Sequence, residues 1–137
     1  MKLAADANVL LSALIGGRAM RVLRHPAVEE ILTAAATVAE VQEYAGQLAK
    51  KKGLAIDMVL LAAAALPVTV VDRLDYAASL PEARRRIGRR DPDDVELLAL
   101  ALHHRLPVWS NDNDFEDAGI TRHTTASLLT LLGSKER

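Results

Sequence analysis

The chain has 137 residues, of which 50% are hydrophobic and only 3% aromatic, and its formal net charge is −1. This length suits one domain, expected to span residues 1–137, and the near-zero charge argues against a protein that binds nucleic acid by bulk charge alone. The sequence contains no cysteine, which excludes disulfides, thiolate metal sites and cysteine nucleophiles. No signal peptide and no apolar run long enough to cross a membrane is visible, so we expect a cytoplasmic protein.

Short apolar strands alternate with helices along the chain. In chain order we expect a strand at 2–5, helices at 9–15 and 18–24, a strand at 31–34, helices at 37–52 and 56–64, a strand at 68–71, helices at 73–87 and 92–105, strands at 107–110 and 122–123, and a helix at 125–132. Asn8 is the expected N-cap of the first helix, and Pro81 the expected break in the helix at 73–87. Strands that are apolar on both faces are typical of a parallel sheet covered by helices on each side. The sequence therefore predicts an α/β fold, a three-layer α/β/α sandwich with a short central parallel sheet.

Four acidic residues are expected at the carboxyl edge of this sheet, where ligands collect in open α/β folds. Asp6 directly follows the first strand, and Asp112 follows the strand at 107–110. Glu40 and Asp94 fall in the first turns of two helices, and helix starts that follow strands face the same edge. We therefore expect these four side chains to converge.

Some of these acids also have a purely structural explanation. Asp91 is a natural N-cap before Pro92. Thr37 and Glu40 have the spacing of a capping box, which would explain Glu40 without a ligand role. Asp6 has no such explanation, because a carboxylate behind a buried strand needs a partner and no basic residue lies nearby in the sequence.

Converging carboxylates imply a bound cation. Two of them about 5 Å apart repel by roughly 3 kcal/mol at an effective dielectric near 20, and four would form several such pairs. Oxygen ligands alone favour Mg²⁺ or Mn²⁺ over zinc or copper. The sequence has four histidines, and none follows a predicted strand with metal-ligand spacing. His103 and His104 end a helix, where a structural role is expected.

Four segments carry a resemblance to a known family. The segment at 6–10 (Asp-Ala-Asn-Val-Leu) follows a strand, and the segment at 94–102 is an aspartate heading an Ala/Leu-rich helix. The segment at 109–115 (Trp-Ser-Asn-Asp-Asn-Asp-Phe) joins a strand to an aspartate and an Asp-Phe ending, and Glu40 opens the long helix. These motifs resemble those of PIN-domain ribonucleases from Lys2 to about Leu132. The family often has threonine or serine in place of Ala7, which here removes a hydroxyl but no metal ligand.

The resemblance implies a ribonuclease that prefers single-stranded RNA and uses one or two Mg²⁺ or Mn²⁺ ions. Its catalytic acids would be Asp6, Glu40, Asp94 and Asp112. The metal would be bound by Asp6, Asp94 and Asp112, and by Glu40 directly or through water. Many small members are VapC-type toxins, which dimerise and are silenced by an antitoxin. The expected partners are therefore RNA, an antitoxin protein and a second copy of the chain.

Two of these assignments have a close competitor. Glu43 lies one turn after Glu40 on nearly the same face of its helix. Asp93 competes with Asp94, which we prefer because the family acid sits seven residues before a helix alanine, and Ala101 fits that spacing.

Other polar residues are expected to support this site. Asn8 and Ser110 would orient carboxylates or a bound water, although capping or turn roles explain them equally well. Asp93 and Asp114 belong to the same surroundings. Arginines before the helix at 92–105 would hold the RNA backbone, or else form a solvated helix end. The arginines expected to bind RNA are Arg85, Arg86, Arg89 and Arg90.

Two other functions fit parts of the sequence. In a non-catalytic interaction module the acids would be capping residues, and the arginines would bind RNA or a partner protein. A phosphotransfer domain also uses an aspartate after its first strand. It needs a phosphate-binding lysine after a later strand, and the segment at 108–115 contains none.

Overall fold

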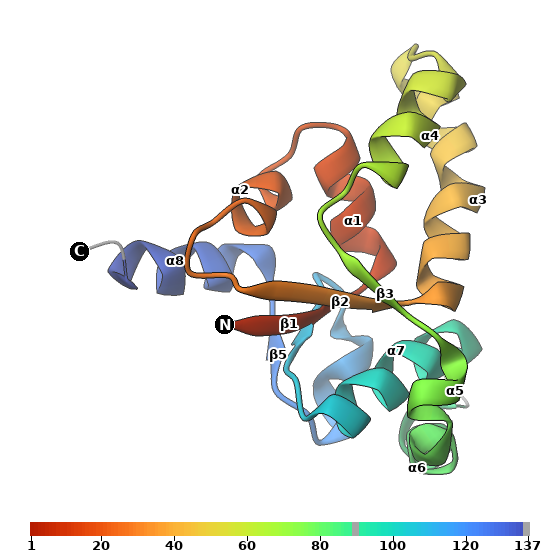
Figure 1. The fold of residues 1–137 in the computed structure, drawn as a ribbon, viewed down its shortest axis with the longest axis vertical. Helices are drawn as coiled ribbons and strands as arrows, with labels where there is room; N and C mark the ends of the chain where they lie inside the picture. The colour runs from red at the N-terminus through yellow and green to blue at the C-terminus, as the bar shows by residue number, and fades with distance from the viewer. Residues whose placement is uncertain (89–90, 136–137) are drawn as a thin grey trace.

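The structure is a computed structural model and describes residues 1–88 and 91–135 (Figure 1). Its centre is a sheet of five parallel strands in the order β3-β2-β1-β4-β5. The strands are β1 (Lys2–Ala5), β2 (Glu30–Ala34), β3 (Thr69–Val71), β4 (Val108–Trp109) and β5 (Arg122–His123). The parallel α/β architecture predicted from the sequence is therefore confirmed.

The strand order reverses direction next to β1. The chain builds outward from β1 to β2 and β3, and then returns so that β4 pairs with the other side of β1. Such a reversal opens a crevice at the carboxyl ends of the two strands, because their following segments turn to opposite faces of the sheet. In this chain the crevice lies beyond Ala5 and Trp109, which pair in the sheet.

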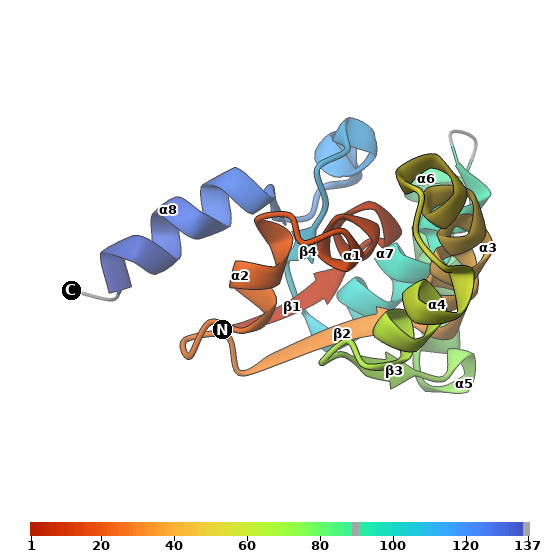
Figure 2. The same ribbon diagram turned by 90° about the horizontal axis from the view of Figure 1, so that it is seen from above.

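Helices cover both faces of the sheet (Figures 1 and 2). The α-helices are α1 (Ala7–Leu14), α2 (Ala19–Leu23), α3 (Ala35–Lys52), α4 (Ile56–Ala64), α5 (Arg73–Tyr76), α6 (Leu80–Ile87), α7 (Pro92–His104) and α8 (Thr125–Lys135), and two 3₁₀ helices are η1 (Ala77–Ser79) and η2 (Asn113–Ala118). Figure 2 shows α8 extending away from the rest of the molecule.

Alternate residues of the strands point into two separate cores, as the period of two in a β-strand requires. Leu3 and Trp109 are fully buried against α1, α2, α3 and α8 on one face. Ala4 and Val108 are fully buried against α6, α7 and η2 on the other. Because both faces are covered, the inner strands β1, β2 and β4 are mainly apolar and buried, whereas the edge strands β3 and β5 are more exposed.

Three local predictions were wrong. Helix α1 begins at Ala7 with Asp6 as its N-cap, so Asn8 lies inside the helix. Helix α3 begins directly after β2 with Ala34 as its N-cap, so Thr37 is already within the helix and the expected capping box does not form. The break in the segment at 73–87 falls at η1, and Pro81 lies in the first turn of α6, where its missing N–H is not needed.

No helix within residues 1–88 and 91–135 combines the length and the apolar character needed to cross a membrane.

Candidate metal centre

Asp6 joins the end of β1 to the start of α1. Its Oδ1 accepts a hydrogen bond from the backbone N–H of Ala7 at 2.8 Å, which caps the helix. Its Oδ2 accepts from the hydroxyl of Ser110 at 2.7 Å and from the side-chain amide of Asn8 at 3.2 Å. The side chain is 7% exposed, so these donors supply the partners that a buried carboxylate needs.

Ser110 lies at the carboxyl end of β4 and is fully buried. Besides donating to Asp6, its oxygen accepts from the backbone N–H of Asp112 at 3.1 Å and from the amide of Asn8 at 3.2 Å. Asn8 in turn accepts from the backbone N–H of Asn111 at 3.3 Å. Asn8 and Ser110 therefore connect the segments that follow β1 and β4, and they fix the orientation of the Asp6 carboxylate.

Asp94 lies in the first turn of α7 and is 7% exposed. Its Oδ2 is fully buried, and nothing in the described part of the chain makes a hydrogen bond to it. The adjacent Asp93 is exposed. Asp91 caps α7 by accepting from the backbone N–H of Asp93 at 3.0 Å. A buried carboxylate oxygen without a donor is costly, so this position requires a ligand or a proton.

Glu40 projects from the second turn of α3 toward the same place. It lines an open cleft of about 290 Å³ together with Asp6, Ala7, Asn8, Leu11, Tyr44, Asp91, Asp94 and Asp112. Of the described residues, Glu43 and Asp93 are exposed and do not line this cleft. The structure thus brings Asp6, Glu40, Asp94 and Asp112 together and favours Glu40 and Asp94 over their competitors.

Asp114 and Asp91 complete the acidic cluster. Carboxylate oxygens of Asp91, Asp94 and Asp114 all lie within 4.8 Å of one another. The sequence indicates only a helix cap at Asp91 and assigns no role to Tyr44. The cap position and the cleft coincide, since α7 begins at the edge of the cleft, and the spacing of Tyr44 four residues after Glu40 would have placed both on one helix face.

Burial and mutual repulsion raise the pKa of three of these acids. Burial raises the pKa of Asp6 more than its hydrogen bonds from Ser110 and Ala7 lower it. Burial, followed by repulsion from Asp6, raises the pKa of Glu40 from 4.5 to about 7. The same two causes raise the pKa of Asp94. Each acid is therefore harder to ionise because the others are present. Raised carboxylate pKa values of this kind are typical of catalytic and binding sites.

The donors fit a divalent cation that prefers oxygen. In the described chain the residues lining the cleft contribute carboxylates, an amide and a phenol, and no lysine, arginine or histidine. The unpartnered Oδ2 of Asp94 is the position that most needs a positive charge. Oxygen ligands alone suit Mg²⁺ or Mn²⁺. Of the acids, Asp6, Asp94 and Asp112 come from three separate segments of the chain and all line the cleft.

The arginines expected to bind RNA differ in their surroundings. The guanidinium of Arg86 donates to the carbonyl of Ala118 at 2.7 Å and to Glu82 at 2.8 Å. It therefore ties α6 to η2 and already has structural partners. Arg85 forms an ion pair with Glu82, but its side chain is 77% exposed. Arg89 and Arg90 lie outside the described residues.

The fold and this cleft define an α/β/α protein with a carboxylate-rich site at the strand-order reversal. The family model described as the PIN domain matches residues 5–133. The chain belongs to the PIN domain family, as the sequence motifs indicated. A search of curated proteins found no significant match.

Solved structures share this fold at low sequence identity. VapBC2 from Rickettsia felis, bound to a promoter DNA fragment, has a TM-score of 0.71 at 14% identity and covers 90% of this chain and 98% of that chain. DNA-bound VapBC from Salmonella typhimurium has a TM-score of 0.70 at 18% identity, covering 91% and 98%. VapC20 from Mycobacterium tuberculosis, a toxin that cleaves the sarcin-ricin loop, has a TM-score of 0.63 at 17% identity, covering 87% and 96%.

Proposed function

We propose that the protein is a metal-dependent ribonuclease that hydrolyses phosphodiester bonds of RNA, and that it acts as a VapC-like toxin. The observation that carries this proposal is the buried, unpartnered Oδ2 of Asp94 in a cleft lined by carboxylates. A site that concentrates negative charge would repel RNA unless a cation were bound. Membership of the PIN domain family and the likeness to VapC20, a toxin that cleaves the sarcin-ricin loop, support the same reaction.

Each residue of the site has a task in this proposal. Asp6, Asp94 and Asp112 would hold Mg²⁺ or Mn²⁺, and Glu40 would contribute directly or through water. When bound there, such an ion would supply an activated water and would stabilise negative charge on the phosphate. Asn8 and Ser110 keep the Asp6 carboxylate in one orientation through their hydrogen bonds.

An RNA cleavage assay tests the reaction. It compares the parent protein in Mn²⁺, the parent in EDTA, and the variant Asp6→Asn in Mn²⁺. Cleavage should need the ion and should be lost in the variant, because Asp6 is placed among the ligands. Asp57→Asn is the matched control, since Asp57 is an exposed aspartate in the first turn of α4. Activity that survives EDTA or Asp6→Asn overturns the proposal, and RNA binding without cleavage would instead indicate a non-catalytic interaction module.

We also propose an antitoxin as the protein partner. Two similar structures are of VapBC bound to DNA, and another structure with this fold is a toxin–antitoxin complex from Klebsiella pneumoniae. A small neighbouring gene for a DNA-binding protein would support this partner. Co-expression of that protein should restore growth to cells that the nuclease inhibits, and unchanged growth would argue against the toxin role while leaving the nuclease untouched.

A second copy of the chain is a further proposed partner. Helix α4 leaves large apolar side chains exposed, among them Met58 at 66% and Leu61 at 65%. Exposed apolar residues grouped on one helix often mark an interface between proteins. Light scattering should give the mass of a dimer, and Leu61→Glu should give the monomer. The control Leu74→Glu changes a leucine that is 87% exposed on α5, and it should leave the dimer intact.

A further inference from the structure

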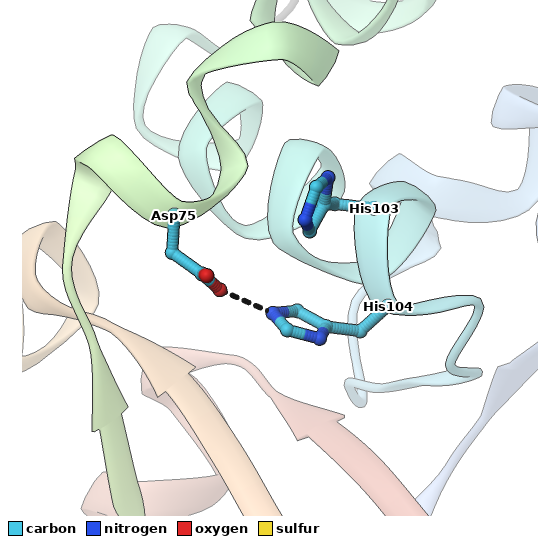
Figure 3. A group of neighbouring side chains, drawn as sticks. All are labelled: Asp75, His103 and His104. Carbon is cyan, nitrogen blue, oxygen red and sulfur yellow. Dashed lines mark hydrogen bonds and ion pairs between the residues drawn. The ribbon is translucent and has the colours of Figure 1, made fainter.

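Helix α7 carries a second group of metal-ligating side chains at its carboxyl end. His103 and His104 occupy its last turn, and Asp75 approaches them from α5 (Figure 3). One ligand atom from each of the three residues lies within 4.8 Å of the other two. The sequence indicated only a structural role for the two histidines, because they end a helix. Asp75 is far from them along the chain and was not expected near them.

The two imidazole rings and the carboxylate converge although the histidines are neighbours in the sequence. Consecutive residues of an α-helix point about 100° apart, so two such rings do not ordinarily share one space. Here the ring centroids are 5.0 Å apart with an interplanar angle of 84°. The Nε2 of His104 lies 2.6 Å from Oδ2 of Asp75. Asp75 therefore lies where it could bind one metal ion together with both rings.

We propose that Asp75, His103 and His104 form a binding site for a divalent transition metal, with Zn²⁺ as the ion that fits best. Two imidazole nitrogens and one carboxylate oxygen are a common protein ligand set for zinc, and water completes the tetrahedron. The carboxyl end of α7 also favours a cation through its exposed carbonyl dipoles. All three side chains reach solvent, so the ion can enter without opening the fold.

This site is separate from the acidic cleft and selects different ions. Asp94 and His104 are ten residues apart on one helix, which corresponds to about 15 Å along its axis. The cleft at the amino end offers oxygen ligands for Mg²⁺ or Mn²⁺, whereas imidazole nitrogens favour zinc, nickel or copper. A high concentration of Mg²⁺ should therefore occupy the cleft and leave the histidine site to Zn²⁺. The zinc site does not depend on the proposed nuclease activity.

The competing explanation is an ordinary surface ion pair between His104 and Asp75. Their side chains are 31% and 49% exposed, so the pair alone would contribute little to stability. Two ligand atoms bonded to one zinc at about 2.0–2.1 Å lie roughly 3.3 Å apart. Nε2 of His104 and Oδ2 of Asp75, now 2.6 Å apart, would therefore have to separate by less than about 1 Å when zinc binds. The explanations differ at His103, which the ion pair does not use and the metal site requires.

Calorimetric titration of Zn²⁺ into the full chain, in excess Mg²⁺, tests the proposal. We expect one Zn²⁺ per chain, and an affinity at least about tenfold weaker in each of His103→Gln, His104→Gln and Asp75→Asn. Asp57→Asn and His25→Gln are the matched controls and should bind as the parent does. Zinc should also raise the melting temperature of the parent and not that of the three variants, because the ion links α5 to the end of α7.

Nuclear magnetic resonance of the imidazole nitrogens gives an independent reading. The ring signals of His103 and His104 should shift together on addition of Zn²⁺, while those of His25 and His123 stay in place. A shift of His104 alone, unchanged affinity in His103→Gln, or the absence of Zn²⁺ binding in excess Mg²⁺ would each overturn the proposal. RNA cleavage in Mg²⁺ should be equal in parent and variants, so failure of the zinc site is distinguishable from failure of the nuclease.

Discussion

The hydroxyl of Ser110 donates to Oδ2 of Asp6 across the strand-order reversal, at 2.7 Å and between residues 104 positions apart in the chain. The same oxygen accepts the backbone N–H of Asp112, so one buried hydroxyl sets the position of two acids of the cleft. The acids that line the cleft repel one another, and fixed donors of this kind are what hold them in place without an ion.

Ser110→Ala should therefore weaken both the fold and the metal site. It removes a buried donor from Asp6 and an acceptor from Asp112, and we expect a loss of about 1–3 kcal/mol in the free energy of unfolding. Affinity for Mn²⁺ should fall about 10- to 100-fold, because the Asp6 carboxylate is no longer oriented. Urea denaturation and Mn²⁺ titration measure the two effects. Ser79→Ala is the control, since within the described chain Ser79 makes no capping hydrogen bond, and it should change neither.

Asp94→Asn should separate stability from metal binding. The substitution removes a charge that is buried beside other carboxylates, so in EDTA the free energy of unfolding should rise by about 1–2 kcal/mol. Affinity for Mn²⁺ should fall at least about tenfold, because the substitution changes Oδ2 of Asp94, the buried carboxylate oxygen that has no hydrogen-bond donor among the described residues. Asp93→Asn, at the exposed neighbouring position, should change both quantities little. If the two variants behave alike, the assignment of Asp94 is wrong.

Without metal, stability should fall as the pH rises. The folded pKa of Glu40 is about 7 against 4.5 for the free side chain, and the pKa of Asp94 is also raised. The folded protein then holds more protons than the unfolded chain. The contribution of Glu40 is complete below about pH 4.5 and is lost as the pH passes through about 7, and that of Asp94 is complete below about pH 3.8 and is lost as the pH passes through about 8. Urea denaturation between about pH 5 and about pH 8 in EDTA measures the slope. Glu40→Gln should make it shallower, and Mn²⁺ should remove most of it, whereas a flat profile in EDTA would contradict the pKa shifts.

The sequence allowed the acidic cleft to be predicted because it depends on topology. Asp6 and Asp112 follow strands whose carboxyl ends must meet at one edge of a parallel sheet, so their convergence does not require knowledge of side-chain packing. The sequence preferred Glu40 only by resemblance and left Glu43 as an alternative. The structure favours Glu40 because it lines the cleft, whereas Glu43 is exposed and does not line it.

The histidine site could not be predicted for a related reason. His103 and His104 are recognisable as a pair, but their third ligand lies in α5, a single helical turn after β3. Its placement against the end of α7 depends on the packing of Tyr76 and Leu80 into one of the two cores. Such a contact between distant segments leaves no periodic signal in the sequence.

Arg85 and Arg86 should respond differently to substitution although they are neighbours. Arg86→Ala removes hydrogen bonds to the Ala118 carbonyl and to Glu82, so we expect a loss of about 1–2 kcal/mol in the free energy of unfolding. Arg85→Ala removes an exposed ion pair and should change stability by less than about 0.5 kcal/mol. If Arg85 contacts the RNA backbone, its loss should weaken RNA binding and make the salt dependence shallower by about one charge. Urea denaturation measures the stability of both variants, and RNA titrations at several salt concentrations measure their RNA binding. Equal destabilisation by the two variants would show that the contact between α6 and η2 does not depend on Arg86.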